Sequence, residues 1–291
     1  MSGVRSIIRL MRPHHYTKNL FVFLPLFFGG QFHHTGLLLK ASWAFLAFCL
    51  VSSSVYIFND VMDRKEDRLH PENRKRPVAA GEIGILQASA LDLLLTAGAL
   101  VIAFMVHRDV LLVILGYKLL NVLYSSGLKR IPIFDMMILA AGFVLRLYAG
   151  SLSTGIALTE WIIIMTFLLA MLITLGKRRN DVLVMEHEGV VLRSSVKQYN
   201  SRFLNYSMLV LSSVIIVAYI LYCLDPETVR RVDQNLYVTS VWVVAGILRY
   251  LQLLFVAERN LNPVVLLFRD HPLKIILLAW ILNFLYYLYI S

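Results

Sequence analysis

The stretch SWAFLAFCLVSSSVYIFNDVMDRKED, from Ser42 to Asp67, joins an uncharged apolar run to an acidic motif. The run from position 42 to position 58 carries no charged residue, and a helix needs about 17–25 apolar residues to cross a bilayer. Asn59 and Asp60 end the run, and Asp63 follows one helical turn later. The stretch therefore predicts a membrane-spanning helix that presents acids at the membrane boundary.

The composition extends this prediction to the whole chain. Of its 291 residues, 58% are hydrophobic and 16% are charged, and the mean hydropathy is +0.70. A soluble domain carries about 25% charged residues. We therefore predict an all-α polytopic membrane protein. The basic N-terminus lacks a small-residue cleavage site, so we expect no signal peptide. Cys49 and Cys223 lie far apart and predict neither a disulfide nor a metal site.

Apolar runs recur along the chain and give a bundle of about nine transmembrane helices. The predicted spans cover residues 19–31, 42–58, 88–106, 110–124, 133–152, 161–175, 206–224, 237–257 and 272–290. The first run is short, and Lys118 and Asn121 interrupt the fourth. Because no Ser/Gly-rich linker and no repeat divides the sequence, we expect a single domain over residues 1–291.

The distribution of Lys and Arg predicts the orientation of these spans. With the N-terminus in the cytoplasm, 21 of the 28 basic residues fall on the cytoplasmic side and four on the opposite side. This places the C-terminus outside and the longest hydrophilic loops, with most acids, inside. We expect a multi-pass protein of the cell (inner) membrane whose site faces the cytoplasm. The net charge of +10 is then a topology signal, and no nucleic-acid partner is needed to explain it.

The acidic motif has the pattern N-D-x-x-D-x-x-x-D, in which Asn59 precedes Asp60, Asp63 and Asp67. On a continuous helix these aspartates share one face. Converging carboxylates repel one another unless a cation lies among them, and Mg²⁺ typically takes one or two carboxylates together with substrate phosphates. Acidic residues at a membrane boundary indicate a functional site. The plainer alternative is a solvated loop of mutually paired charges.

The basic cluster HPENRKRP follows directly, from His70 to Pro77. Arg74 and Arg76 carry planar guanidinium groups that suit bidentate contacts with phosphate oxygens. The acids and the bases together predict a site that grips a diphosphate through Mg²⁺.

Three further groups of charges accompany the motif. Lys129 and Arg130 precede a span that carries Asp135 and Arg146 on one face. About 16 Å of helix rise separates that acid from that arginine, so we expect them to line a polar cavity rather than pair. The run Lys177, Arg178, Arg179 ends a predicted span and serves either as a membrane anchor or as part of the cavity. The stretch RPHHYTKN, at residues 12–19, is either an amphipathic helix or a further part of the site.

These features together resemble the UbiA superfamily of intramembrane prenyltransferases. That family has nine transmembrane helices and Mg²⁺-binding aspartate motifs open to the cytoplasm. Its first motif is met by the residues from Asn59 to Asp67, followed by the N-R-x-R-P element Asn73, Arg74, Arg76 and Pro77. Its second motif, D-x-x-x-D, is incomplete, because Leu139 stands four residues after Asp135.

With this acid missing, the sequence pattern more closely resembles the branch of decaprenyl-phosphate phosphoribosyltransferases. The stretches RPHHYTKN, YSSGLKRIPIFDMMILAAGFVLR, LGKRRND and NPVVLLFRDHPL are similar to that branch. The resemblance implies Mg²⁺-dependent transfer of phosphoribose from phosphoribosyl pyrophosphate to a polyprenyl phosphate lipid. A more cationic site suits three phosphate groups better than the single diphosphate of a prenyl donor.

The resemblance also implies roles for individual residues. Catalytic roles fall to Asp60, Asp63 and Asp135. The metal ligands are Asn59, Asp60, Asp63 and Asp67. The substrate-binding residues are Lys18, Asn19, Asn73, Arg74, Arg76, Tyr124, Lys129, Arg146, Lys177 and Arg178.

Two alternatives remain open from the sequence. One is an aromatic polyprenyltransferase of the same fold, which moves a prenyl group from prenyl diphosphate to an acceptor such as 4-hydroxybenzoate. The other is a transporter or metal-binding membrane protein without turnover. Discontinuous spans in repeated halves would favour the second, and the sequence has none.

Overall fold

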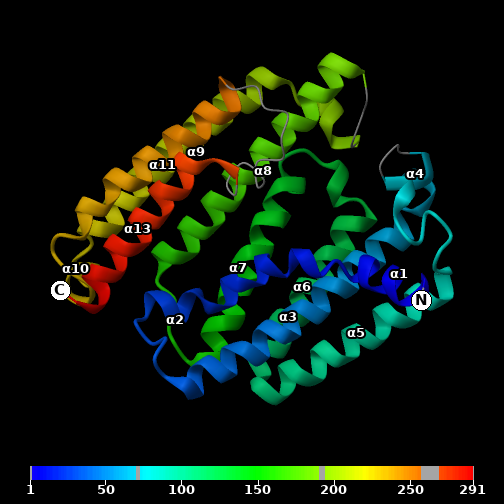
Figure 1. The fold of residues 1–291 in the computed structure, drawn as a ribbon, viewed down its shortest axis with the longest axis horizontal. Helices are drawn as coiled ribbons and strands as arrows, with labels where there is room; N and C mark the ends of the chain where they lie inside the picture. Colours follow the sequence, from blue (N-terminus) through cyan, green and yellow to red (C-terminus); the bar gives the residue numbers. More distant parts are fainter. Residues whose placement is uncertain (1, 70–72, 190–193, 257–268, 291) are drawn as a thin grey trace. The chain divides into compact units, whose positions relative to one another are not determined.

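The computed structural model describes residues 2–69, 73–189, 194–256 and 269–290 (Figure 1). Every regular element within these ranges is a helix, which confirms the all-α prediction. The chain forms two compact units, Met1–Leu158 and Thr159–Ser291. The single domain predicted over residues 1–291 stays a prediction.

The first unit contains the acidic motif. Its elements are α1 (Ser2–Met11), η1 (Pro13–Phe23), α2 (Leu24–Phe28), α3 (Thr35–Met62), α4 (Arg64–Leu69), η2 (Asn73–Lys75), α5 (Ile85–Val106), α6 (Arg108–Ser126), η3 (Leu128–Arg130) and α7 (Phe134–Thr154). The second unit contains α8 (Glu160–Glu188), η4 (Ser194–Gln198), α9 (Ser201–Leu224), α10 (Pro226–Arg231), η5 (Leu236–Thr239), α11 (Ser240–Phe255) and α13 (His271–Tyr289). The η elements are 3-10 helices.

Eight helical segments in the described ranges are long and apolar enough to cross a membrane. They are α3, α5, α6, α7, α8, α9, η5 together with α11, and α13. Each coincides with one of the predicted spans. The remaining predicted span, residues 19–31, is not a membrane-length α-helix, because it folds as the second half of η1 followed by α2.

The segment of η1 and α2 is nevertheless long. A 3-10 helix rises roughly 2.0 Å per residue and an α-helix about 1.5 Å. The 11 residues of η1 and the five of α2 therefore extend about 30 Å end to end, close to the roughly 30 Å hydrocarbon core of a bilayer. A steeper rise lets fewer residues cover a given distance, but η1 and α2 are not among the eight segments of the described ranges that meet the length and composition of a membrane span.

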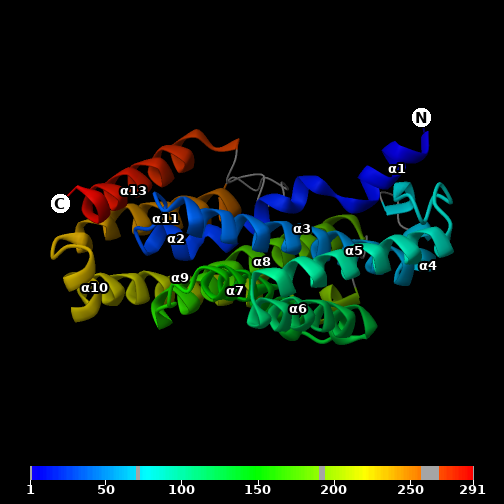
Figure 2. The ribbon, with the colours of Figure 1, turned by 90° about the horizontal axis from the view of Figure 1, so that it is seen from below.

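Helix α3 is the centre of the first unit. It packs against η1, α5, α6 and α7, and Figure 2 shows α5 running alongside it. Small residues such as Ala44 and Ala47 are fully buried in this core beside Phe48, and small side chains let neighbouring helices approach closely in a membrane. Ser54 adds a hydrogen bond of 2.9 Å to Thr96 of α5. The central position of α3 fixes the place where its last turn delivers the acidic motif.

A close backbone approach joins η1 to α7. A Cβ atom added to Gly150 of α7 would lie 1.9 Å from the carbonyl oxygen of Val22. No side chain fits at this distance, so the glycine lets η1 lie directly on the helix.

We predict that Gly150→Ala lowers the free energy of unfolding by about 2–3 kcal/mol, because the backbones must separate. Gly116→Ala is the matched control, since Gly116 is also helical and has no atom within 4 Å of the added Cβ. We expect the control to be neutral or to gain up to about 1 kcal/mol of helix propensity. Thermal unfolding in detergent measures both, and equal melting temperatures would contradict the packing argument.

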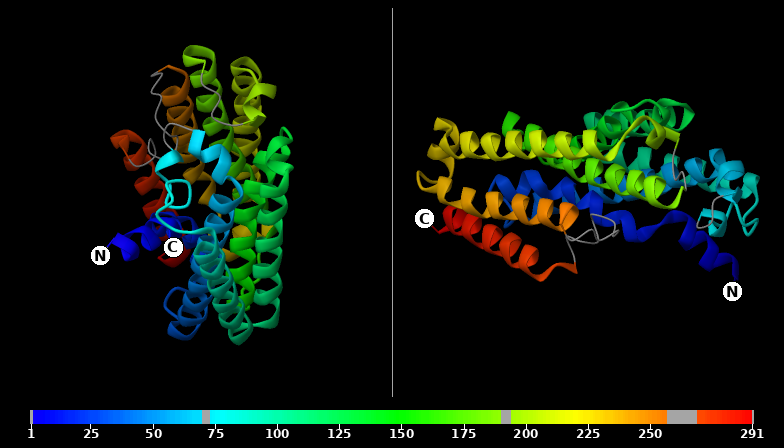
Figure 3. Two further views of the ribbon diagram at one scale, coloured as in Figure 1. Left: turned by 90° about the vertical axis from the view of Figure 1, so that its right-hand side faces the viewer. Right: turned by 90° about the horizontal axis from the view of Figure 1, so that it is seen from above.

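The second unit is a layered helical bundle. Figure 3 shows α11 between α9 and α13, and α8 packs on α9. Tyr219 of α9 joins these layers, because its hydroxyl pairs with Thr239 of η5 at 2.8 Å and accepts a hydrogen bond of 2.7 Å from Trp280 of α13. These buried polar contacts fix the register of the second unit.

Candidate active site

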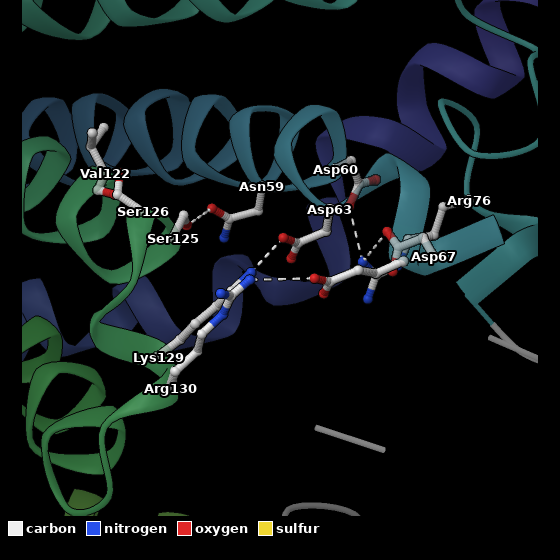
Figure 4. A network of polar contacts seen from close by, with 11 residues as sticks. Asn59, Asp60, Asp63, Asp67, Arg76, Val122, Ser125, Ser126, Lys129 and Arg130 are labelled. Atoms are coloured by element: carbon white, nitrogen blue, oxygen red, sulfur yellow. Dashed lines mark hydrogen bonds and ion pairs between the residues drawn. The ribbon is translucent and has the colours of Figure 1, made fainter. Parts of the chain in front are cut away.

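The acidic motif lies where α3 ends and α4 begins. Asn59 and Asp60 belong to the last turn of α3, Asp63 follows that helix, and Asp67 lies in α4. The single continuous helix expected from the sequence is therefore interrupted at Asp63. The hydrogen-bond pattern still continues, since the backbone N–H groups of Asp63 and Asp67 each bond the carbonyl four residues earlier at 2.8 Å. The four side chains consequently remain neighbours (Figure 4).

Arg76 bridges two of these acids. Its Nη1 lies 2.7 Å from Asp67 Oδ2 and 3.4 Å from Asp60 Oδ1. Asn73, at the start of η2, also hydrogen-bonds the Asp67 side chain. The backbone N–H of Arg76 bonds the carbonyl of Asn73 at 2.8 Å, so one tight turn presents both residues to the same acid. The N-R-x-R-P spacing therefore places Asn73 and Arg76 in one turn, where both contact Asp67.

The other side of the site comes from α6 and η3. Lys129 forms an ion pair with Asp63, and the hydroxyl of Ser125 donates a hydrogen bond to Asn59 Oδ1 (Figure 4). Arg130 pairs with the exposed Glu66 at 3.5 Å. Side chains of the segment from α6 to η3 therefore bind the side-chain oxygens of the acidic motif and of Glu66.

Arg12 supplies a further cation from the N-terminal segment. Its Nη2 lies 2.5 Å from Asp60 Oδ1, and its guanidinium lies 5.2 Å from the ring centre of Tyr56. The sequence pattern did not mark Arg12 or Ser125 as site residues. For Arg12 the only local signal was its place at the start of RPHHYTKN, 48 residues before its partner. Contacts of that separation are set by the fold.

Burial shapes the electrostatics of the acids. Asp60 is 1% exposed and Asp67 is buried. Burial raises the pKa of the Asp67 carboxyl above its ordinary value, and the charge and hydrogen bonds of Arg76 and Asn73 offset this only in part. Two carboxylates removed from water at one place require positive charge beside them.

The sequence profile of the UbiA prenyltransferase family matches residues 20–269. The chain belongs to this family.

Two relatives resemble the chain over nearly its full length. A decaprenyl-phosphate phosphoribosyltransferase of Mycolicibacterium smegmatis is 30% identical over 289 residues, covering 96% of this chain and 91% of the relative. A decaprenyl-phosphate phosphoribosyltransferase of Mycobacterium tuberculosis is 28% identical, covering 96% and 92%. The fold is shared with a UbiA homolog from Archaeoglobus fulgidus solved bound to DMAPP and Mg²⁺, at a TM-score of 0.74 and 22% identity, covering 98% of this chain and 100% of the homolog. The protein is thus a multi-pass UbiA-family transferase.

The donor atoms of this UbiA-type motif fit a Mg²⁺ ion. They are carboxylate and amide oxygens, the ligands that Mg²⁺ prefers. Asp60 Oδ2 is buried and has no hydrogen-bond partner among the described residues, so one ligand atom is available. In the described part of the chain no three acids already converge on one point that could hold an ion. Because Asp60, Asp63 and Asp67 each contact a basic side chain, the predicted convergence requires those contacts to rearrange.

Asn19 and Arg146, both predicted to bind substrate, hold each other in the core of the first unit. Arg146 Nε donates to Asn19 Oδ1 at 2.8 Å, and its other nitrogens donate to Gly142 O at 2.7 Å and to the Tyr117 hydroxyl at 3.0 Å. The guanidinium also lies over the ring of Phe48. The cost of an arginine at membrane depth is met by these contacts. Arg146 therefore has protein partners for its guanidinium, and the polar cavity expected around it stays a prediction.

The other predicted site residues of the first unit lie in four different helical elements. Asp135 is fully buried in the first turn of α7, and Tyr124 is buried in α6 directly before Ser125. Lys18 is half-buried in η1, and Arg74 is exposed in η2. Their roles toward a substrate stay predictions.

The basic run from Lys177 to Arg179 directly follows the predicted span 161–175 and lies inside α8, which continues to Glu188. Arg178 is buried and pairs with Asp181 at 3.3 Å. Arg179 donates to Asn205 Oδ1 at 2.6 Å and lies 5.2 Å from the ring centre of Phe255. These contacts let the helix continue through three charges. The run belongs to the second unit, so its part in the site stays a prediction.

Proposed function

We propose that this UbiA-family transferase moves phosphoribose from phosphoribosyl pyrophosphate to a polyprenyl phosphate and releases diphosphate. The observation that carries the proposal is the full-length similarity to decaprenyl-phosphate phosphoribosyltransferases, at 30% identity over 96% of the chain. The basic residues around the acidic motif and Leu139 at the second-motif position support the same donor.

The proposed roles follow from the contacts of the motif. Asp60, Asp63 and Asn59 would hold Mg²⁺, with Asp67 beside them. When bound, Mg²⁺ neutralises the charge that builds on the leaving diphosphate. Arg76 and Lys129 already lie at the acids, from where they would bind phosphate oxygens.

The proposed reaction exchanges one bond at ribose C1. The C1–O bond to diphosphate breaks, the bonding electron pair leaves with the diphosphate, and C1 acquires oxocarbenium character. An oxygen of the lipid phosphate attacks C1 from the opposite face. That phosphate is already an anion, so no side chain must remove a proton. Asp135 would orient the ribose hydroxyls, and the polyprenyl chain would lie against the apolar helices in the membrane.

The excess of Lys and Arg on one side of the predicted spans supports a site that faces the cytoplasm. Phosphoribosyl pyrophosphate is a water-soluble, highly charged donor. A cytoplasmic opening would admit that donor from water, while the lipid acceptor arrives from the bilayer.

The test compares two donor–acceptor pairs with purified protein in detergent and Mg²⁺. One pair is ribose-labelled phosphoribosyl pyrophosphate with polyprenyl phosphate; the other is labelled prenyl diphosphate with 4-hydroxybenzoate. We expect labelled lipid phosphate from the first pair, at a rate roughly a hundredfold or more above the second. Chelation of Mg²⁺ should stop the reaction and renewed Mg²⁺ should restore it. A prenylated aromatic acid from the second pair, with no product from the first, would contradict the proposed donor.

A further inference from the structure

Arg12 is held at the acidic motif by an unusual backbone. Its φ is 54° and its ψ is 56°, which is the left-handed region that residues other than glycine rarely adopt. Arg12 precedes Pro13, where a right-handed helix is disfavoured, so α1 ends at Met11. The backbone of Arg12 bonds Ile8 O at 3.2 Å and accepts from His15 N at 3.0 Å. After this turn the side chain contacts Asp60 and Tyr56 of α3.

Helix α1 is itself fixed to the segment that carries Arg76. Arg9 pairs with Glu82 at 3.1 Å and donates to the carbonyl of Lys75 at 2.5 Å. Ser6 donates to Glu82 at 2.6 Å, and Leu10 is fully buried. Ser6, Arg9 and Leu10 lie on one face of α1, and that face anchors the helix. The strained turn that follows the helix places Arg12 at Asp60.

The two arginines at Asp60 differ in their other partners. Arg76 also holds Asp67 at 2.7 Å, whereas the ion pair recorded for Arg12 in the described part of the chain is with Asp60 alone. The Arg12 side chain is 20% exposed, so water reaches it. Arg12 is therefore the cation that can leave Asp60 without abandoning a second acid.

A divalent cation and Arg12 would compete for the same carboxylate. Asp60 Oδ1 receives Arg12 at 2.5 Å and Arg76 at 3.4 Å, while Asp60 Oδ2 is buried and without a hydrogen-bond partner among the described residues. A metal bound to Asp60 would lie close to the Arg12 guanidinium, and like charges at such distances repel. The diphosphate of a donor offers that guanidinium oxygens of opposite charge in planar, bidentate geometry.

We propose that Arg12 exchanges partners during the reaction cycle: it pairs with Asp60 until metal and diphosphate bind, and then it binds the diphosphate. The proposal rests on the proposed function, because it takes Asp60 as a metal ligand and a diphosphate as the leaving group. It assigns two opposite effects to one side chain. Arg12 weakens the binding of the metal alone and strengthens the binding of the metal with diphosphate.

The test measures Mn²⁺ binding by electron paramagnetic resonance, first with Mn²⁺ alone and then with inorganic diphosphate present. In Arg12→Gln we expect Mn²⁺ alone to bind roughly tenfold more tightly than in the unmodified protein. With diphosphate present, we expect binding to be roughly tenfold weaker. Arg5→Gln is the matched control, since it removes the same charge from an exposed residue of α1. Both of its binding constants should stay within about twofold of the unmodified protein.

Two further variants keep the test decisive if Arg12→Gln unfolds. Arg12→Gly suits the left-handed backbone and should show the same two opposite shifts. Arg12→Lys keeps the charge and should bind Mn²⁺ alone like the unmodified protein. Unchanged or weaker binding of Mn²⁺ alone in Arg12→Gln and Arg12→Gly would overturn the partner exchange. If neither the unmodified protein nor the Arg12 variants bound Mn²⁺, with or without diphosphate, both the partner exchange and the assignment of Asp60 as a metal ligand would be wrong. Opposite shifts without phosphoribosyl transfer would support the exchange and refute only the donor.

Discussion

The double variant Asp60→Asn, Asp63→Asn should lose transferase activity by roughly a thousandfold or more, since it removes both charges that would hold Mg²⁺ at the donor diphosphate. The protein should still fold and insert. Asparagine keeps the shape of aspartate, and Arg76 keeps its 2.7 Å contact with Asp67. The Arg12 and Lys129 side chains, which lose the charge of their partner acids, are 20% and 19% exposed, so water can solvate them. Initial rates with saturating Mg²⁺, together with circular dichroism and gel filtration, measure both halves of this prediction.

Glu66→Gln is the matched control for the loss of charge in this segment. Glu66 lies between Asp63 and Asp67 in sequence, but its exposed carboxylate pairs only weakly with Arg130 at 3.5 Å. We expect its rate to stay within about twofold of the unmodified protein. Full activity in the double variant would sink the assignment of these aspartates as metal ligands. An equal loss in Glu66→Gln would show that the overall negative charge of the segment matters more than the positions of the acids.

The acidic motif and its first basic partners could be predicted from the sequence because their spacing is local. Asn59 to Asp67 span little more than two helical turns, and Asn73 and Arg76 share one tight turn. Arg12 could not be predicted in this way. Its contact with Asp60 depends on the strained turn after α1 and on the docking of that helix, and neither leaves a periodic pattern in the sequence.

The bounds and types of the helices were harder to predict than the apolar runs themselves. The run from Lys177 to Arg179 follows the predicted span, and α8 continues past it to Glu188, with Arg178 and Arg179 paired to Asp181 and Asn205. Residues 19–31 are apolar enough for a span, yet the chain adopts a 3-10 helix through Phe23 and only a short α-helix after it. Hydrophobicity predicts which segments leave water, whereas partners across the bundle decide where each helix ends.

Lys118 and Asn121, which interrupted the fourth predicted span, lie within α6. Lys118 Nζ is 2.6 Å from Asp92 Oδ1 of α5 and 2.7 Å from Ser54 Oγ of α3. Its ammonium group also lies 5.6 Å from the ring centre of Phe58, the residue directly before the acidic motif. One lysine therefore connects three helices of the first unit. Charges inside spanning helices are costly unless they are paired, so the pair with Asp92 is what makes this lysine tolerable.

We therefore predict that Lys118→Met lowers the free energy of unfolding by about 3 kcal/mol, because it leaves the Asp92 carboxylate unpaired in an apolar layer. The double variant Lys118→Met, Asp92→Leu should recover to within about 1 kcal/mol of the unmodified protein, since it removes both charges. Lys40→Met is the matched control: Lys40 is exposed near the start of α3, and its change should stay within about 0.5 kcal/mol. Denaturant unfolding in detergent micelles gives all four values. A double variant no more stable than Lys118→Met would mean that the lysine stabilises the bundle through Ser54 and Phe58 and not through its charge. Recovery in the double variant would instead assign the cost to the unpaired carboxylate, and with it the reason why a charged residue persists in this span.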